Sequence, residues 1–100
     1  MNNSKYQSTD DLKRTINPID FYTQELQEAR INVRKKWAIA GLCPFHEDRR
    51  IGSFYINTET GGFICHSCGN KGGDIIAFVR MKYQLPFKEA VQKLINEWRR

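Results

Sequence analysis

Cys43-Pro-Phe-His46 and Cys65-His-Ser-Cys68 are the two short stretches that decide the fold of this chain. Each holds two soft metal ligands in an x-x spacing, and the chain between the two stretches has room for a β-hairpin. Zinc takes four such ligands in a tetrahedron, and this spacing lets a tight turn aim both side chains of a pair at one point. Because four ligands fill the shell, we expect one structural zinc ion and no open position for a substrate.

Two other interpretations of these residues stay open. The cysteines could be buried apolar side chains and His46 a hydrogen-bonded core residue, although chance rarely sets two such pairs around a hairpin. His66 is the rival for the fourth ligand, and knuckle spacing favours His46, which leaves His66 facing solvent or a partner. A thiol redox switch is disfavoured because closed zinc thiolates react poorly and the number of cysteines, three, is odd.

Size, composition and charge narrow the class of protein. The 100 residues suffice for one small domain, whose apolar core alone gives marginal stability, so bound zinc would supplement it. We expect no membrane-spanning segment and no export signal, because the first fifteen residues are polar. An odd cysteine count without an export signal predicts a reducing, cytoplasmic environment. The formal charge of +5 changes by one unit if three thiolates bind a divalent ion, and it favours a polyanionic partner.

Local patterns predict an α+β fold. The centre is a small zinc ribbon, an antiparallel β-sheet with two zinc knuckles, flanked by one N-terminal helix and two C-terminal helices. Asn17 and Asp74 are expected N-caps, and apolar residues recur with a helical period from Phe87 to Trp98. The expected elements are helices over 17–28, 74–82 and 87–98, a strand over 31–39, and a hairpin of 53–57 and 62–65. We expect residues 1–15 to form a flexible tail and residues 16–100 to form the domain.

Alternation in the predicted strand separates an apolar face from a basic face. The odd positions from Ile31 to Ile39 are mostly apolar and include Trp37, whereas the even positions include Arg34 and Lys36. We therefore expect Trp37 in the core, and Trp98 of the last helix as well.

Four motifs in order carry a family resemblance: Gly41-Leu-Cys-Pro-Phe-His46, Ser53-Phe-Tyr-Ile-Asn57, Phe63-Ile-Cys-His-Ser-Cys-Gly69 and Gly72-Gly-Asp-Ile-Ile-Ala-Phe-Val79. From about Ile16 to Trp98 the chain resembles the CHC2 zinc-binding domain of bacterial DnaG-type and phage DNA primases. The resemblance implies a zinc ribbon that binds single-stranded template DNA for primer synthesis in DNA replication. It also implies that the zinc ligands are Cys43, His46, Cys65 and Cys68.

The chain departs from that family in two places. The family's catalytic portion, which holds magnesium on carboxylates, has no counterpart in these residues, so we expect no enzymatic activity from this chain on its own. Relatives often carry a basic or aromatic residue just before the position of Gly41, where this chain has Ile39-Ala40. We expect the DNA-contacting surface to be shifted toward Arg34 to Trp37.

Single strands are held by cations that track phosphates and by aromatic rings that stack on bases. Surface cations more often serve solubility, so each assignment to DNA is a hypothesis. The expected DNA-binding residues are Arg34, Lys35, Lys36, Arg49, Arg50, Tyr55 and Lys71.

Two kinds of partner fit these patterns. If the chain binds DNA, we expect its protein partner to be a primase catalytic subunit or a replicative helicase. The chain would then act in trans, as a separate polypeptide beside the catalytic subunit. The alternative is a zinc ribbon that binds a replication or transcription enzyme through its last helix. An exposed apolar face on helix 87–98 would favour this alternative, and a face covered by the domain's first helix would favour DNA binding.

Overall fold

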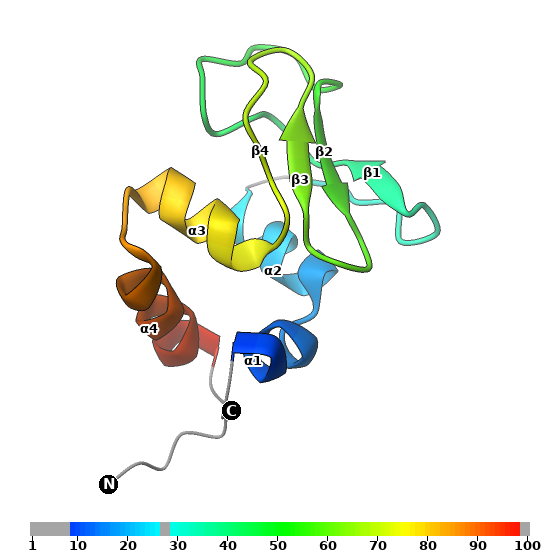
Figure 1. Cartoon of the computed structure of the whole chain (residues 1–100). Coiled ribbons are helices and arrows are strands. Elements are labelled where there is room, and N and C mark those ends of the chain that lie inside the picture. Colours follow the sequence, from blue (N-terminus) through cyan, green and yellow to red (C-terminus); the bar gives the residue numbers. More distant parts are fainter. Residues whose placement is uncertain (1–8, 27–28, 99–100) are drawn as a thin grey trace, which may run out of the picture.

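The structure, a computed structural model, describes residues 9–26 and 29–98. Within them lie four helices and one four-stranded antiparallel sheet in the order β1-β2-β3-β4, which confirms the α+β class (Figure 1). The helices gather on one side of the sheet (Figure 1). The elements are α1 (Thr9–Thr15), α2 (Pro18–Glu25), β1 (Trp37–Ile39), β2 (Phe54–Asn57), β3 (Phe63–Cys65), β4 (Lys71–Gly72), α3 (Ile75–Tyr83) and α4 (Phe87–Trp98).

An aromatic cluster joins the sheet to the helices. The ring of Phe78 on α3 lies with its centroid 5.0–6.3 Å from five other rings, which come from α2, the first knuckle and the sheet. Gly72 lets β4 approach this cluster, because a Cβ there would come within 2.6 Å of the Phe63 ring. The packing of these rings fixes the sheet against α3, and the knuckles extend from that fixed base. The five rings around Phe78 belong to Phe21, Tyr22, Phe45, Phe54 and Phe63.

The two predicted N-caps are confirmed. Asn17 Oδ1 accepts hydrogen bonds from the backbone N–H groups of Ile19 and Asp20, at 2.8 and 3.1 Å. Asp74 Oδ1 accepts from the N–H of Ala77 at 2.9 Å and begins α3. Each cap satisfies backbone donors that the first turn of a helix leaves unpaired, so these two starts are encoded locally.

The N-terminal segment differs from the prediction. Residues 9–15 form α1 instead of belonging to a flexible tail, and the side chain of Leu12 is completely buried. Lys13 Nζ lies 3.3 Å from Asp74 Oδ2, which connects α1 to the start of α3. A seven-residue helix with a single leucine carries no detectable period, so its order depends on packing against distant parts of the chain. Residues 1–8 lie outside the described residues.

The strand predicted over residues 31–39 is shorter in the structure, and the face predicted to meet the core faces solvent. Only Trp37–Ile39 forms β1, and the inward side chain is that of Ala38, whereas Trp37 is 45% and Ile39 is 39% exposed. The pairing of Ala38 with Ile56 on β2 sets this orientation. The prediction that Trp37 lies in the core was wrong, because strand register is decided by the partner strand and not by local alternation.

The apolar face of α4 is largely covered. Ala90 and Leu94 are buried, and the Trp98 ring centroid lies 6.0 Å from that of Phe21 on α2, so Trp98 packs against the core as predicted. Phe87, at the start of α4, stays 48% exposed. No helix in the described part of the chain has the length and apolar character needed to cross a membrane.

Candidate metal centre and nucleic-acid interface

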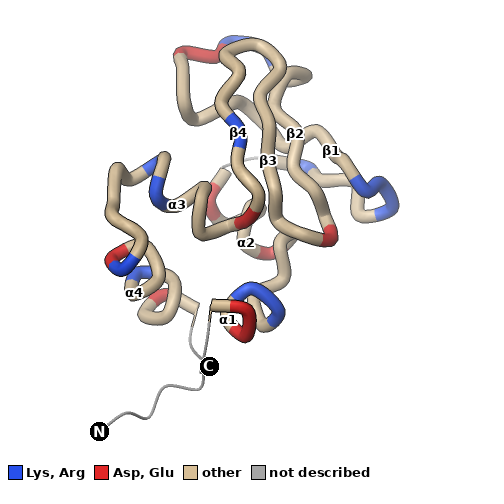
Figure 2. Tube along the Cα trace, in the orientation of Figure 1, with Lys and Arg blue, Asp and Glu red and all other residues tan. Residues whose placement is uncertain are grey.

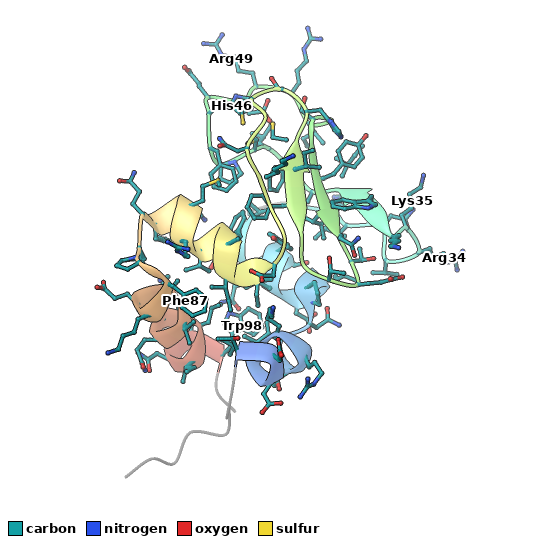
Figure 3. The ribbon with its side chains drawn as sticks, in the orientation of Figure 1. Arg34, Lys35, His46, Arg49, Phe87 and Trp98 are labelled. Carbon is teal, nitrogen blue, oxygen red and sulfur yellow. The ribbon has the colours of Figure 1, made fainter. Side chains whose placement is uncertain are left out.

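Four side chains from the two knuckles converge at one end of the sheet. The possible ligand atoms of Cys43, His46, Cys65 and Cys68 all lie within 4.8 Å of one another. Cys43 and His46 come from the loop after β1, Cys65 ends β3, and Cys68 follows in the turn toward β4. Figure 3 shows His46 at this end of the molecule, far from α1 and α4.

The separations between donor atoms fit a tetrahedral zinc site. Cys43 Sγ and Cys68 Sγ are 3.9 Å apart, and Cys65 Sγ lies 3.4 Å from His46 Nε2. Zinc bonds of about 2.3 Å to sulfur and 2.0–2.1 Å to nitrogen would place two sulfurs about 3.8 Å apart, and a sulfur and a nitrogen about 3.6 Å apart. Three sulfurs and one imidazole are therefore placed so that they can close a shell around one zinc ion.

Backbone groups hold each knuckle in this shape. Gly69 has φ +83°, a left-handed conformation that allows its N–H to reach the carbonyl of Cys65 at 2.8 Å. The backbone N–H of Phe45 donates to Cys43 Sγ at 3.4 Å, and that of Cys68 donates to Cys65 Sγ at 3.5 Å. Such N–H donors stabilise thiolate ligands and orient them toward the metal.

Asp48 supports the first knuckle from outside the shell. Its Oδ2 accepts a hydrogen bond of 2.8 Å from the backbone N–H of Cys43. This bond is the main reason that the pKa of Asp48 lies below its usual range. The carboxylate is therefore ionised at neutral pH and closes the loop between the first knuckle and the charged segment after it.

The metal-free thiols differ in acidity according to their surroundings. Burial raises the pKa of Cys43 to about 12, with smaller effects from its neighbours. At Cys68, desolvation acts to raise the pKa, but hydrogen bonds from Asn70 and from the other two thiols together lower it below the ordinary value. A divalent ion bound by these thiols would deprotonate them, so zinc uptake would release protons.

His66 does not join the group of four donors. Its ring lies 5.2 Å from that of Tyr55 in an edge-to-face arrangement, and the residue is exposed. It follows Ile64 by two positions, on the face of the sheet that points away from the helices. In the structure, therefore, His66 lies on the open face of the sheet and His46 lies in the candidate metal centre.

The open face of the sheet carries a row of side chains from all four strands. Ile39, Tyr55, Ile64 and Lys71 stand opposite one another in the strand register, and Trp37 lies on the same face two positions from Ile39. An open hollow of about 730 Å³ lies on this face. It is lined by Trp37, Tyr55, Phe63, Ile64, His66, Lys71, Gly72 and Gly73.

The seven expected DNA-binding residues do not form one groove. Tyr55 and Lys71 line the hollow, and the other five do not. Figure 2 shows the basic residues of the sheet region in separate places, and Figure 3 places Arg49 beside His46 and Arg34 with Lys35 beyond β1. The basic groups 34–36 and 49–50 are exposed and flank the sheet from two sides.

Sequence reasoning missed three residues that shape the site. Asp48 and Asn70 support the knuckles, and Asn57 caps the hairpin turn by accepting two backbone N–H groups at 2.8 and 2.9 Å. Asp and Asn commonly bond to nearby backbone groups, so their positions just after a knuckle or at the end of a strand were the available signal. Trp37 was noticed but assigned to the wrong side of the sheet.

Comparison with known proteins points to one family. The profile of the CHC2 zinc finger family matches residues 5–99. The DNA primase of Lactococcus lactis is 35% identical over 86 residues, which are 86% of this chain and 13% of the relative. The DNA primase of Helicobacter pylori is 36% identical over 88 residues, 87% of this chain and 15% of the relative.

A solved structure shares the fold. The crystal structure of the zinc binding and RNA polymerase domains of Aquifex aeolicus primase aligns with a TM-score of 0.69 and 29% identity, covering 89% of this chain and 21% of that chain. This chain therefore spans a small share of the length of its relatives. Because the profile, the relatives and the Cys3His group agree, the chain belongs to the CHC2 zinc finger family, as a DnaG-type primase zinc-binding domain with one structural zinc ion.

Proposed function

We propose that Cys43, His46, Cys65 and Cys68 bind the zinc ion, and that the open face of the sheet binds single-stranded template DNA for primer synthesis. The observation that supports DNA binding most strongly is the arrangement of Trp37, Tyr55 and Lys71 on one solvent-facing surface. The zinc ion holds the sheet and knuckles together and takes no part in chemistry.

The open face has the properties of a base-stacking surface. Aromatic rings bind bases through their faces whatever the base, and Trp37 and Tyr55 project such rings from neighbouring strands. Ile64 supplies apolar surface beside Tyr55, and Lys71 provides a cation at the far edge of the sheet. A fully paired duplex hides its base faces, so this surface should prefer single strands.

A basic turn leads onto this surface. The N–H groups of Arg34 and Lys35 bond to the side chain and the carbonyl of Asn32, at 3.0 and 3.1 Å. The hydroxyl of Thr58 on the hairpin donates to the Lys35 carbonyl at 2.7 Å. The turn that carries the cations is therefore tied to the sheet, and it ends directly at Trp37. Because the cations directly precede Trp37, a single strand could place its phosphates at the cations while its bases stack on the aromatic rings.

The covering of α4 favours DNA binding over protein docking through that helix. Leu94 is buried and Trp98 packs near Phe21 of α2, so most of the apolar face of α4 is used inside the domain. We propose that the protein partner is a primase catalytic subunit, with which this chain acts in trans, or a replicative helicase. The DNA primase relatives support this choice of partner.

Fluorescence anisotropy with a short labelled single strand tests the binding surface. Stacking contributes about 1–3 kcal/mol per base, so Trp37→Ala and Tyr55→Ala should each weaken binding about five- to 150-fold. Phe87→Ala is the matched control, because Phe87 is an aromatic residue of similar exposure on α4 and away from the sheet. A Trp37→Ala/Tyr55→Ala variant that binds as well as the wild type would rule out this surface.

Salt dependence separates the cations that contact phosphates from those that only face solvent. Removal of one cation that pairs with a phosphate of a single strand makes the slope of log affinity against log salt shallower by about 0.7. We expect that change for Lys71→Ala and for Arg34→Ala. Arg14→Ala, on the distant helix α1, should leave the slope unchanged.

Primer synthesis tests the role in replication. The zinc-loaded chain is mixed with a primase catalytic fragment and a panel of templates, and primers are counted. Template-dependent stimulation, abolished in the Trp37→Ala/Tyr55→Ala variant, is the expected result. Absence of stimulation despite tight binding to a helicase or polymerase would instead support a protein-docking ribbon.

A further inference from the structure

The four donor atoms of the metal centre differ in their access to solvent. Cys43 and Cys65 are buried and His46 is half-buried, whereas Cys68 is exposed. Loss of zinc from a closed shell begins where water or a chelator can reach a bond between ligand and metal, because zinc can expand to five ligands while one is replaced. Cys68 is therefore the ligand at which we expect the exchange of zinc to begin.

Asn70 bonds to this sulfur through its side chain as well as through its backbone. The Nδ2 group of Asn70 lies 3.4 Å from Cys68 Sγ, whereas the corresponding bonds to Cys43 and Cys65 come from backbone N–H groups. The carbonyl of Asn70 separately accepts a 2.9 Å bond from the N–H of Cys65. The backbone of Asn70 thus closes the second knuckle, and its side chain folds back onto the exposed sulfur.

We propose that Asn70 is a positioning residue for the metal centre, whose side-chain amide holds the exposed Cys68 sulfur in place and slows the loss of zinc. An N–H donor withdraws charge from a thiolate and restrains its rotation, so both the strength and the direction of the bond to the metal depend on it. This inference rests on the proposed role of Cys68 as a ligand.

Zinc release from the whole loaded chain into excess chelator measures the effect. Asn70→Ala keeps the backbone bond to Cys65 and removes only the amide, and removal of such an outer hydrogen bond typically weakens metal binding about 10–100-fold. We expect release at least about tenfold faster than in the wild type. Asn70→Asp should release zinc faster still, because a carboxylate has no N–H to donate and adds a like charge.

Two further measurements separate positioning from a general loss of stability. Ser67→Ala alters an exposed residue of the same knuckle and should release zinc at the wild-type rate. In the cobalt-substituted protein, removal of the N–H donor should move the sulfur-to-cobalt charge-transfer band to lower energy for Asn70→Ala but not for Ser67→Ala. Circular dichroism of each zinc-loaded variant reports whether it remains folded.

The outcomes distinguish this inference from the ligand assignment. If Cys68→Ser leaves the charge-transfer intensity unchanged, Cys68 is not a ligand and the assignment itself fails. If Cys68→Ser lowers the intensity but Asn70→Ala has the release rate and spectrum of the wild type, the ligand assignment stands and the role of Asn70 is overturned.

Discussion

Replacement of Leu12 by alanine tests whether α1 belongs to the folded domain. Leu12 is completely buried although it lies in a segment of seven residues near the start of the chain. Truncation of a buried leucine typically costs about 2–5 kcal/mol, which combines the removal of apolar burial with the cavity left behind. A loss of about 2 kcal/mol would lower the melting temperature of a domain this small by about 8–16 °C.

The structure also sets an upper limit on the stability that Leu12→Ala can remove. If Leu12→Ala releases α1 from the domain, the loss cannot exceed the free energy with which α1 docks, because the rest of the fold can persist without it. The expected value is therefore near 2 kcal/mol, at the lower end of the range for buried leucines. A smaller denaturant slope would accompany undocking, since less surface would then be exposed on unfolding.

Urea and thermal unfolding at one fixed concentration of free zinc measure this difference. Zinc must be held constant because it stabilises the folded state by mass action. Leu42→Ala is the matched control: Leu42 is 45% exposed, and the same truncation there should change stability by less than about 0.5 kcal/mol. If Leu12→Ala and Leu42→Ala unfold alike, α1 does not contribute to the stability of the domain.

The metal centre, the hairpin and the core each give one further prediction. Cys65→Ser, or excess chelator on the wild type, should unfold the domain, since zinc binding at such sites contributes on the order of 10–16 kcal/mol; NMR spectra with full native dispersion under chelation would contradict this. Asn57→Ala should cost about 1–3 kcal/mol in urea unfolding, because two backbone N–H groups of the hairpin turn would be left without their acceptor. Burial, and then the carboxylates of Asp74 and Glu25, raise the pKa of Tyr22 well above 10.0, so its contribution to stability is present below about pH 10 and is lost as pH rises through the folded pKa. In an alkaline absorbance titration the phenolate signal of Tyr22 should thus appear only when the domain unfolds, and early titration of all tyrosines would contradict its burial.

Features that depend on short stretches of chain could be predicted from the sequence. The x-x spacing brings Cys43 near His46 and Cys65 near Cys68 whatever surrounds them, so this group of possible donors could be predicted, with His46 favoured over His66, before the fold was known. The cap at Asn17 and the helical period of α4 are equally local, because their partners lie within a few residues. Physical interactions across one or two turns are visible in a linear sequence.

The tertiary structure decided which face of the sheet carries Trp37. Alternation around Trp37 indicated two faces but not which of them met the core, and pairing of Ala38 with Ile56 settled the choice. The pairings of β2 with β3 and of β3 with β4 align Tyr55 with Lys71 through Ile64, and Arg49 lies apart from them at the metal end (Figure 3). The burial of Leu12 likewise requires contacts that a short helix cannot provide itself. Register and docking arise from contacts between distant residues, so only the folded chain contains them.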